Sequence, residues 1–168
     1  YYCEDWCEKT FTGIDNNITS QKSSIICKAI DLNSRIAFFK RWVYAREQEE
    51  YLAYDVTSVS SYSRGNDNIE WGYNRDKEQL PQINIGMIFG ENSKIPVYYN
   101  VYPGSIPDKS YLDYMFRDTE MLGIKYSKLV MDKGFFTEEN LRNLARKTIG
   151  FIISMPTKKK LSIKLIKA

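Results

Sequence analysis

The 168-residue chain contains no histidine. This absence excludes the Ser-His-Asp and Cys-His nucleophile systems, and it removes the side chain that most often acts as a general base near neutral pH. Acid–base or metal chemistry must therefore use Asp, Glu, Lys, Tyr or Cys. The three cysteines (Cys3, Cys7 and Cys27) form no CxxC pair. We expect reduced, partly buried thiols rather than a disulfide framework or a zinc site.

The sequence also lacks a long apolar run. No stretch approaches the roughly 20 residues that cross a bilayer, and no signal peptide is evident, so no membrane partner is expected. Neither charge sign dominates, because 24 Lys and Arg stand against 21 Asp and Glu. The hydrophobic share of 43% and the length favour one globular domain with a single core. The chain opens on Tyr1 rather than Met, which predicts a fragment of a longer protein.

Hydrophobic periodicity predicts helices first and strands afterwards. Residues 20–30 and 34–46 have helical spacing, with Asn33 or Ser34 as the N-cap of the second helix. From Tyr51 the apolar residues alternate, as is typical of a strand, and 83–89 and 96–102 form two more strands joined by a short turn. Residues 58–68 are rich in Ser, Asn and Gly, which predicts a mobile loop.

The second half alternates helices with strands. A helix that begins at Asp108 or Ser110 and stops at Gly123 precedes a strand at 128–132. A helix capped by Thr137 and ended by Gly150 precedes the last strand, at 151–155. The order β-β-β-α-β-α-β, after two helices, is that of a ribonuclease H-like α/β fold with a mixed sheet. We divide the chain into a helical segment at 1–49, an incomplete core at 50–156 and a basic tail at 157–168.

This topology would bring two aspartates together. Asp55 lies within the first strand and Asp132 closes the fourth, and a parallel crossover places the carboxyl ends of both strands at one edge. Two neighbouring carboxylates repel and are costly to bury, and a divalent cation relieves both effects. A pair of such ions would activate the attacking oxygen and stabilise the leaving oxygen in phosphodiester chemistry. The alternative is a turn-capping role, which suits Asp132 better than Asp55, because Asp is depleted in strands.

Five segments carry a family resemblance. They are Tyr-Asp-Val-Thr-Ser (54–58), Trp-Gly-Tyr-Asn-Arg-Asp (71–76), Leu-Pro-Gln-Ile-Asn (80–84), Tyr-Pro-Gly-Ser-Ile-Pro-Asp (102–108) and Val-Met-Asp-Lys-Gly-Phe (130–135). In this order they resemble the DDE transposases of bacterial insertion sequences, most closely the group numbered four and its relatives. The resemblance runs from about residue 50 to residue 155. It implies that Asp55 and Asp132 are catalytic and hold Mg²⁺ or Mn²⁺ in a two-metal site.

The resemblance further implies a DNA transposase that cleaves the ends of an insertion element and transfers the freed strands into target DNA. The expected partner is DNA, and no small-molecule cofactor is expected. The complete protein is expected to form a homodimer and to be cytoplasmic and nucleoid-associated. The family's third carboxylate, a Glu on a late helix, has no counterpart in the sequence, since Glu138 and Glu139 follow Asp132 too closely. Two alternatives remain: a nuclease that does not join strands, and an inactive remnant that binds DNA or dimerises with intact transposase.

Cations near the expected site are candidates for DNA contacts. Arg64, Arg75, Lys77 and Lys133 flank it and could meet phosphates, although solvated surface charge explains each of them equally well.

Aromatic and amide side chains lie in the same part of the sequence. Trp71 and Tyr73 could stack on an exposed base, but packing against the sheet is the expected role. Gln82 and Asn84 share one strand face and could line the site, but ordinary exposed positions are expected.

Overall fold

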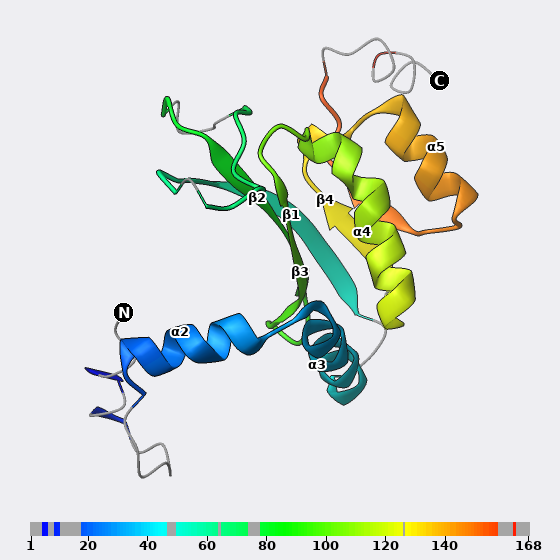
Figure 1. Cartoon of the computed structure of the whole chain (residues 1–168). Helices are drawn as coiled ribbons and strands as arrows, with labels where there is room; N and C mark the ends of the chain where they lie inside the picture. Colours follow the sequence, from blue (N-terminus) through cyan, green and yellow to red (C-terminus); the bar gives the residue numbers. More distant parts are fainter. Residues whose placement is uncertain are drawn as a thin grey trace. The chain divides into compact units, whose positions relative to one another are not determined.

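The computed structural model describes residues 5–6, 9–10, 18–46, 50–63, 65–73, 78–125, 127–157 and 163. The chain divides into two compact units, Tyr1–Arg41 and Trp42–Ala168. The first contains helix α2 (Ser20–Ala29) and most of helix α3 (Leu32–Ala45), drawn in blue in Figure 1. Within the described ranges, no helix combines the length and apolar character needed to cross a bilayer.

Two local expectations for the first unit were wrong. Asp31, rather than Asn33 or Ser34, caps α3, because its Oδ1 accepts a hydrogen bond from the Ser34 N–H at 2.7 Å. Cys27 is exposed on α2 rather than partly buried. Cys3 and Cys7 lie outside the described residues.

The second unit is built on a five-stranded mixed sheet with the strand order β3-β2-β1-β4-β5. Its strands are β1 (Tyr51–Ser60), β2 (Gln82–Gly90), β3 (Pro96–Pro103), β4 (Lys128–Met131) and β5 (Phe151–Ile153). The pairs β1–β2 and β2–β3 are antiparallel, and the pairs β1–β4 and β4–β5 are parallel. The predicted hairpin, the central first strand and the parallel crossover are therefore confirmed.

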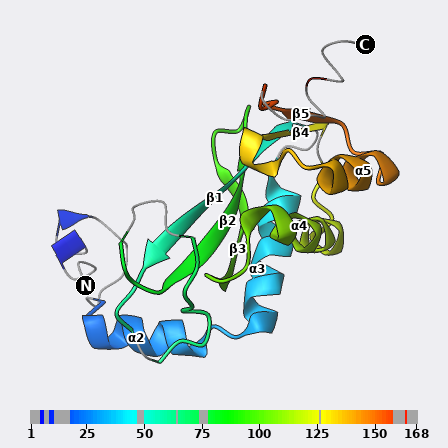
Figure 2. The same cartoon turned by 90° about the horizontal axis from the view of Figure 1, so that it is seen from above.

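Helices α4 (Asp108–Leu122) and α5 (Glu138–Arg146) follow the two crossovers, with the short 3-10 helix η1 (Lys133–Phe135) between β4 and α5. Helix α4 packs on β2, η1 and α5, and Figure 2 shows α4 and α5 side by side. Gly123, with a φ of 71°, ends α4 as predicted, because glycine tolerates the left-handed conformation. Thr137 caps α5 as predicted, but this helix ends at Arg146, well before Gly150.

Alternation along β1 creates a buried face and an exposed face. Leu52, Tyr54 and Val56 are buried, whereas Asp55 points to the other face and is exposed. The buried face packs on α4, and the position of Gly86 in β2 shows how tightly. A Cβ at Gly86 would lie 3.0 Å from both a Met115 side-chain atom and the Tyr54 hydroxyl. The core is therefore closely packed beneath the strand that carries Asp55.

Strand β1 is longer than the sequence predicted. Residues 58–60, expected in a mobile loop, continue the strand and pair with β2 as far as Ser60 opposite Gln82. On its other side β1 pairs with β4 only as far as Tyr54 opposite Met131. The carboxyl half of β1 therefore projects beyond the end of β4. This step in the sheet exposes the edge at which the two aspartates lie.

A buried ion pair supports the opposite end of the unit. Arg46 Nη1 contacts Glu50 Oε1 at 2.6 Å, and Arg46 Nη2 donates to the Lys125 carbonyl. Glu50 also accepts hydrogen bonds from the backbone N–H groups of Asn92 and Ser93, each at 2.8 Å. Burial alone would raise the pKa of Glu50, but these hydrogen bonds and the Arg46 charge outweigh it and hold the pKa below its ordinary value.

Candidate functional site

The strand register brings the two predicted catalytic aspartates together. Tyr54 and Met131 form the last residue pair of the parallel β1–β4 ladder, and Asp55 and Asp132 follow them directly in the chain. The two aspartates therefore occupy neighbouring positions where β4 ends. Both are exposed. The expected cost of burying two carboxylates thus does not arise.

The local structure after β4 fixes the Asp132 side chain. Asp132 is the N-cap of η1, and its Oδ1 accepts a hydrogen bond from the Gly134 N–H at 2.7 Å. A Cβ at Gly134 would lie only 2.9 Å from that oxygen. Glycine is therefore required for this close approach, which explains why the motif reads Asp-Lys-Gly. Asp132 does have the capping role that the sequence offered as an alternative, and it performs this role at the edge of the sheet.

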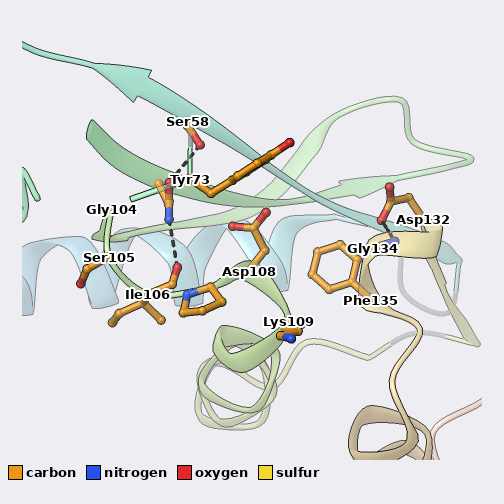
Figure 3. Close-up of a pocket in the computed structure, with 12 residues that line it drawn as sticks. Ser58, Tyr73, Gly104, Ser105, Ile106, Asp108, Lys109, Asp132, Gly134 and Phe135 are labelled. Atoms are coloured by element: carbon orange, nitrogen blue, oxygen red, sulfur yellow. Dashed lines mark hydrogen bonds between the residues drawn. The ribbon is translucent and has the colours of Figure 1, made fainter. Parts of the chain in front are cut away.

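A pocket of about 260 Å³ opens beside Asp132. It is lined by Ser58, Tyr73, Asn84, Asp132, Gly134, Phe135 and the segment 104–109. Figure 3 shows the Asp108 carboxylate between the rings of Tyr73 and Phe135, with Asp132 on the far side of Phe135. Asp55 does not line this pocket, because it lies on the opposite face of β1 from Ser58. The site therefore has two parts: the Asp55–Asp132 edge and the pocket next to it.

Asn84, which lines the pocket, and Gln82 on the same strand face are both buried, contrary to expectation. Gln82 is 1% exposed and Asn84 is 2% exposed. Asn84 Nδ2 donates to the Ile106 carbonyl at 3.1 Å, and its Oδ1 accepts from Ser58 Oγ at 3.0 Å. Gln82 Nε2 donates to the Tyr73 carbonyl at 2.9 Å. Sequence alternation gave the shared face of Gln82 and Asn84 but could not show that α4 and its preceding loop cover that face.

Asp108 lines the pocket, whereas its sequence position predicts only the start of a helix. Its Oδ1 accepts a hydrogen bond from the Tyr102 hydroxyl at 2.9 Å. Burial, reinforced by the Asp108 charge, raises the pKa of both Tyr102 and Tyr54 above the ordinary tyrosine value. The Tyr54 hydroxyl is buried and has no hydrogen-bond partner among the described residues. The available signal for Asp108 was its place in the resembling segment at 102–108.

The structure describes only one of the four cations that were predicted to contact DNA. Lys133 is exposed directly after Asp132. Arg64, Arg75 and Lys77 lie outside the described residues.

The two aromatic residues do not pack against the sheet as expected. Trp71 is 67% exposed and Tyr73 is 84% exposed. The Tyr73 ring borders the pocket, so it is positioned at the site and accessible from solvent.

Asp55 and Asp132 suit a hard divalent cation chemically. Their carboxylate oxygens are the ligands that Mg²⁺ takes, one or two from protein and the rest from water and substrate phosphates. Within the described part of the chain, no group of three His, Cys, Asp or Glu side chains is arranged to hold a metal. The described donors therefore fit an ion completed by water and phosphate and do not form an all-protein cage.

Comparisons with known proteins agree with this geometry. A family model described as a transposase DDE domain matches residues 46–167. No match to a curated protein sequence was found. Among solved structures, a piggyBac transposase synaptic complex with hairpin DNA matches with a TM-score of 0.53 and 16% identity, covering 81% of this chain and 29% of that chain. A Mos1 transposase paired-end complex with the left transposon end matches with a TM-score of 0.40 and 10% identity, covering 83% of this chain and 55% of that one.

The first of these similarities shows a shared fold, which is the ribonuclease H-like mixed sheet expected from the element order. The chain spans less than two-thirds of the length of either transposase.

Proposed function

Because the chain belongs to the transposase DDE domain family, we propose that it acts as the catalytic core of a DNA transposase. The observation that carries this proposal is the parallel register that places Asp132 beside Asp55 where β4 ends. The proposed reaction is cleavage of DNA at the ends of a mobile element and transfer of the freed 3′-hydroxyl into target DNA. Water and then the 3′-hydroxyl are the nucleophiles, with no covalent protein intermediate.

Asp55 and Asp132 supply the carboxylates that would hold Mg²⁺ or Mn²⁺. When bound, the ions would activate the attacking oxygen and stabilise charge on the leaving oxygen. The chain's own contribution is orientation. The Gly134 N–H fixes one oxygen of Asp132, and the register of β1 against β4 fixes the spacing of the two backbones. Lys133, exposed beside Asp132, is suited to attract a DNA phosphate to the same edge.

DNA is the proposed partner. The piggyBac structure that shares the fold is a synaptic complex with hairpin DNA, which supports a DNA-binding role for this chain. Asp55 and Asp132 are both exposed, so a DNA phosphate could reach them from solvent. Arg64, Arg75, Lys77 and Lys133 are the proposed phosphate contacts, and a homodimer is the proposed state of the complete protein.

A second candidate is a non-catalytic remnant that binds DNA or pairs with an intact transposase. One observation favours it: no third carboxylate joins Asp55 and Asp132 within the described residues. Glu138, the first acidic residue after Asp132 in the chain, pairs instead with Arg142 on α5. With two carboxylates rather than three, metal affinity and strand transfer by this chain alone would be reduced.

A metal titration separates the two candidates. The unfolding temperature is measured with Mg²⁺, Mn²⁺ and Ca²⁺ for the wild-type chain, Asp55→Asn and Asp132→Asn, with Asp113→Asn on α4 as the matched control. A catalytic core should be stabilised by the ions, because binding to the folded state alone raises its stability. Each site variant should lose this response while Asp113→Asn keeps it. A response that is absent, or equal in all four proteins, would favour the remnant.

A further inference from the structure

Helix α5 carries a polar side chain at a position that faces the core. The buried residues of this helix are Asn140, 5% exposed, and Leu144, 0% exposed, and they lie about one turn apart on the same face. An apolar residue is expected at such a position, and a buried amide lowers stability unless its polar atoms form hydrogen bonds. The asparagine at position 140 therefore requires a specific partner.

The partner is the turn that follows Asp132. Asn140 Nδ2 donates to the Phe135 carbonyl at 3.0 Å in a buried hydrogen bond. The same carbonyl accepts from the Thr137 N–H at 2.9 Å. The backbone of Asn140 is itself held, because its N–H donates to Thr137 Oγ1 at 3.1 Å. Asn140 thus joins the first turn of α5 to the last residue of η1.

The side chain of Phe135 holds η1 as well. Phe135 is 2% exposed and packs against Tyr54, with the two ring centroids 5.0 Å apart. Tyr54 directly precedes Asp55 in β1. The ring contact therefore ties η1 to the strand that carries Asp55, while the carbonyl of the same residue ties η1 to α5 through Asn140.

Helix η1 depends on such outside contacts. It has three residues, and 3-10 helices have poorer hydrogen-bond geometry than α-helices. Its two backbone hydrogen bonds are long, at 3.3 Å from the Phe135 N–H to the Asp132 carbonyl and 3.2 Å from the Phe136 N–H to the Lys133 carbonyl. The same turn contains Gly134, whose N–H donates to Asp132 Oδ1 at 2.7 Å (Figure 3). A change that releases η1 should therefore free this carboxylate too.

We propose that Asn140 is a positioning residue for the Asp55–Asp132 edge, acting on the Asp132 carboxylate through the Phe135 carbonyl and the η1 turn. The proposal rests on the proposed function, because this edge is where the divalent ion would bind. Asn140 is buried, so its effect on the ion is indirect. Loss of a group that orients a metal ligand typically weakens metal binding by roughly 10- to 100-fold.

The first measurement is made without metal, on the ¹⁵N-labelled chain in EDTA. The chemical shift of the Gly134 amide proton reports its hydrogen bond to Asp132, and Asp132→Ala gives the shift without the acceptor. We expect Asn140→Leu, of similar size, and Asn140→Ala, a good helix former, to move the Gly134 shift toward that of Asp132→Ala. The double variant Asn140→Leu/Asp132→Ala should show no further change, because substitutions within one hydrogen-bond network are not additive.

The second measurement is a Mg²⁺ titration of the same proteins, followed by amide chemical shifts. Asn140→Leu and Asn140→Ala should bind Mg²⁺ roughly 10- to 100-fold more weakly than the wild type. Asn143→Leu is the matched control, because Asn143 lies on the same helix and donates its side-chain amide to Asp113 Oδ2 on α4 at 2.9 Å. This variant also loses a side-chain hydrogen bond, but it should keep the wild-type Gly134 shift and Mg²⁺ affinity.

Three results would overturn the proposal. They are a wild-type Gly134 shift in both Asn140 variants, a change of the same size in Asn143→Leu, and an equal effect of Asn140→Leu with and without the Asp132 carboxylate. Unchanged Mg²⁺ affinity in the Asn140 variants, with a wild type that binds the ion, would also contradict it. A wild-type chain that does not bind Mg²⁺ would instead contradict the proposed function. The Gly134 shift in EDTA would still decide whether Asn140 positions Asp132.

Discussion

Asp132 follows Met131, the residue paired with Tyr54 in the parallel ladder, and so lies beside Asp55 where β4 ends. The two side chains reach this edge by different routes. Asp55 belongs to a strand that continues to Ser60, whereas Asp132 leaves its strand and caps η1. The backbone of Asp55 is held by sheet pairing and its Oδ1 accepts from the Val56 N–H at 2.8 Å, whereas Asp132 is held by a hydrogen bond within a turn. The second arrangement is the easier one to disturb by a single substitution.

Gly134→Ala is expected to reorient the Asp132 carboxylate with little effect on the fold. The new Cβ would lie 2.9 Å from Asp132 Oδ1, and a side-chain carboxylate can rotate away from it. The free energy of unfolding should fall by about 0.5–2 kcal/mol, the usual effect of losing a cap. The Mg²⁺ or Mn²⁺ response in a thermal titration should fall much more. Gly65→Ala in the exposed loop, where a Cβ meets nothing within 4 Å, is the control. An unchanged metal response would show that the orientation of Asp132 is unimportant.

Glu50→Gln is expected to destabilise the second unit strongly. The substitution removes the charge that Arg46 contacts at 2.6 Å and leaves a buried guanidinium without its counter-ion. Breaking a buried pair from one side typically costs about 3–5 kcal/mol. Chemical denaturation provides the measurement. Glu91→Gln removes the exposed partner of Lys94 and should cost only about 0–1 kcal/mol. Equal effects of the two substitutions would mean that the buried pair contributes no more than a surface pair.

The Glu50 contacts also predict a pH dependence. The pKa of Glu50 is lowered in the folded state, so its carboxylate contributes stability that is present above the unfolded-state pKa near 4.5. That contribution is lost as the pH falls through the folded-state pKa. Unfolding free energies of the wild type should therefore drop on acidification below about pH 5. Glu50→Gln should show a shallower drop, because glutamine does not titrate in this range. If the unfolding free energies of the wild type and Glu50→Gln changed equally with pH, Glu50 would not be the source of the pH dependence.

Two tyrosine variants should change stability in opposite directions. Tyr54→Phe removes a buried hydroxyl that has no partner among the described residues, so the unfolding free energy should rise by about 1 kcal/mol or more. Tyr102→Phe removes the hydroxyl that donates to Asp108 at 2.9 Å and should lower it by about 1–3 kcal/mol. The same denaturation experiment serves both variants. A loss of stability in Tyr54→Phe would indicate that an ordered water satisfies the hydroxyl.

The fold could be predicted in outline because the hydrophobic periodicity and the residues that begin or end helices are clear in the sequence. Alternation from Tyr51, the stop at Gly123 and the cap at Thr137 each reflect forces within a few residues of chain. The errors arose where distant contacts decide. Residues 58–60 have a loop-like composition, yet pairing with β2 makes them strand. The end of α5 was also missed, since Thr148 rather than Gly150 takes the left-handed conformation, with a φ of 55°.

The candidate site, like the fold, could be predicted from the sequence only in part. By itself the sequence determined that histidine chemistry is excluded, which elements form, and that a parallel crossover would carry Asp55 and Asp132 to one edge, because these follow from composition, period and chain direction. Only the tertiary structure decided that both aspartates are exposed, that Gln82 and Asn84 are buried, and that Asp108 faces the pocket beside Asp132. Those properties depend on which surface α4 and its preceding loop cover, and burial is set by partners that are distant in sequence.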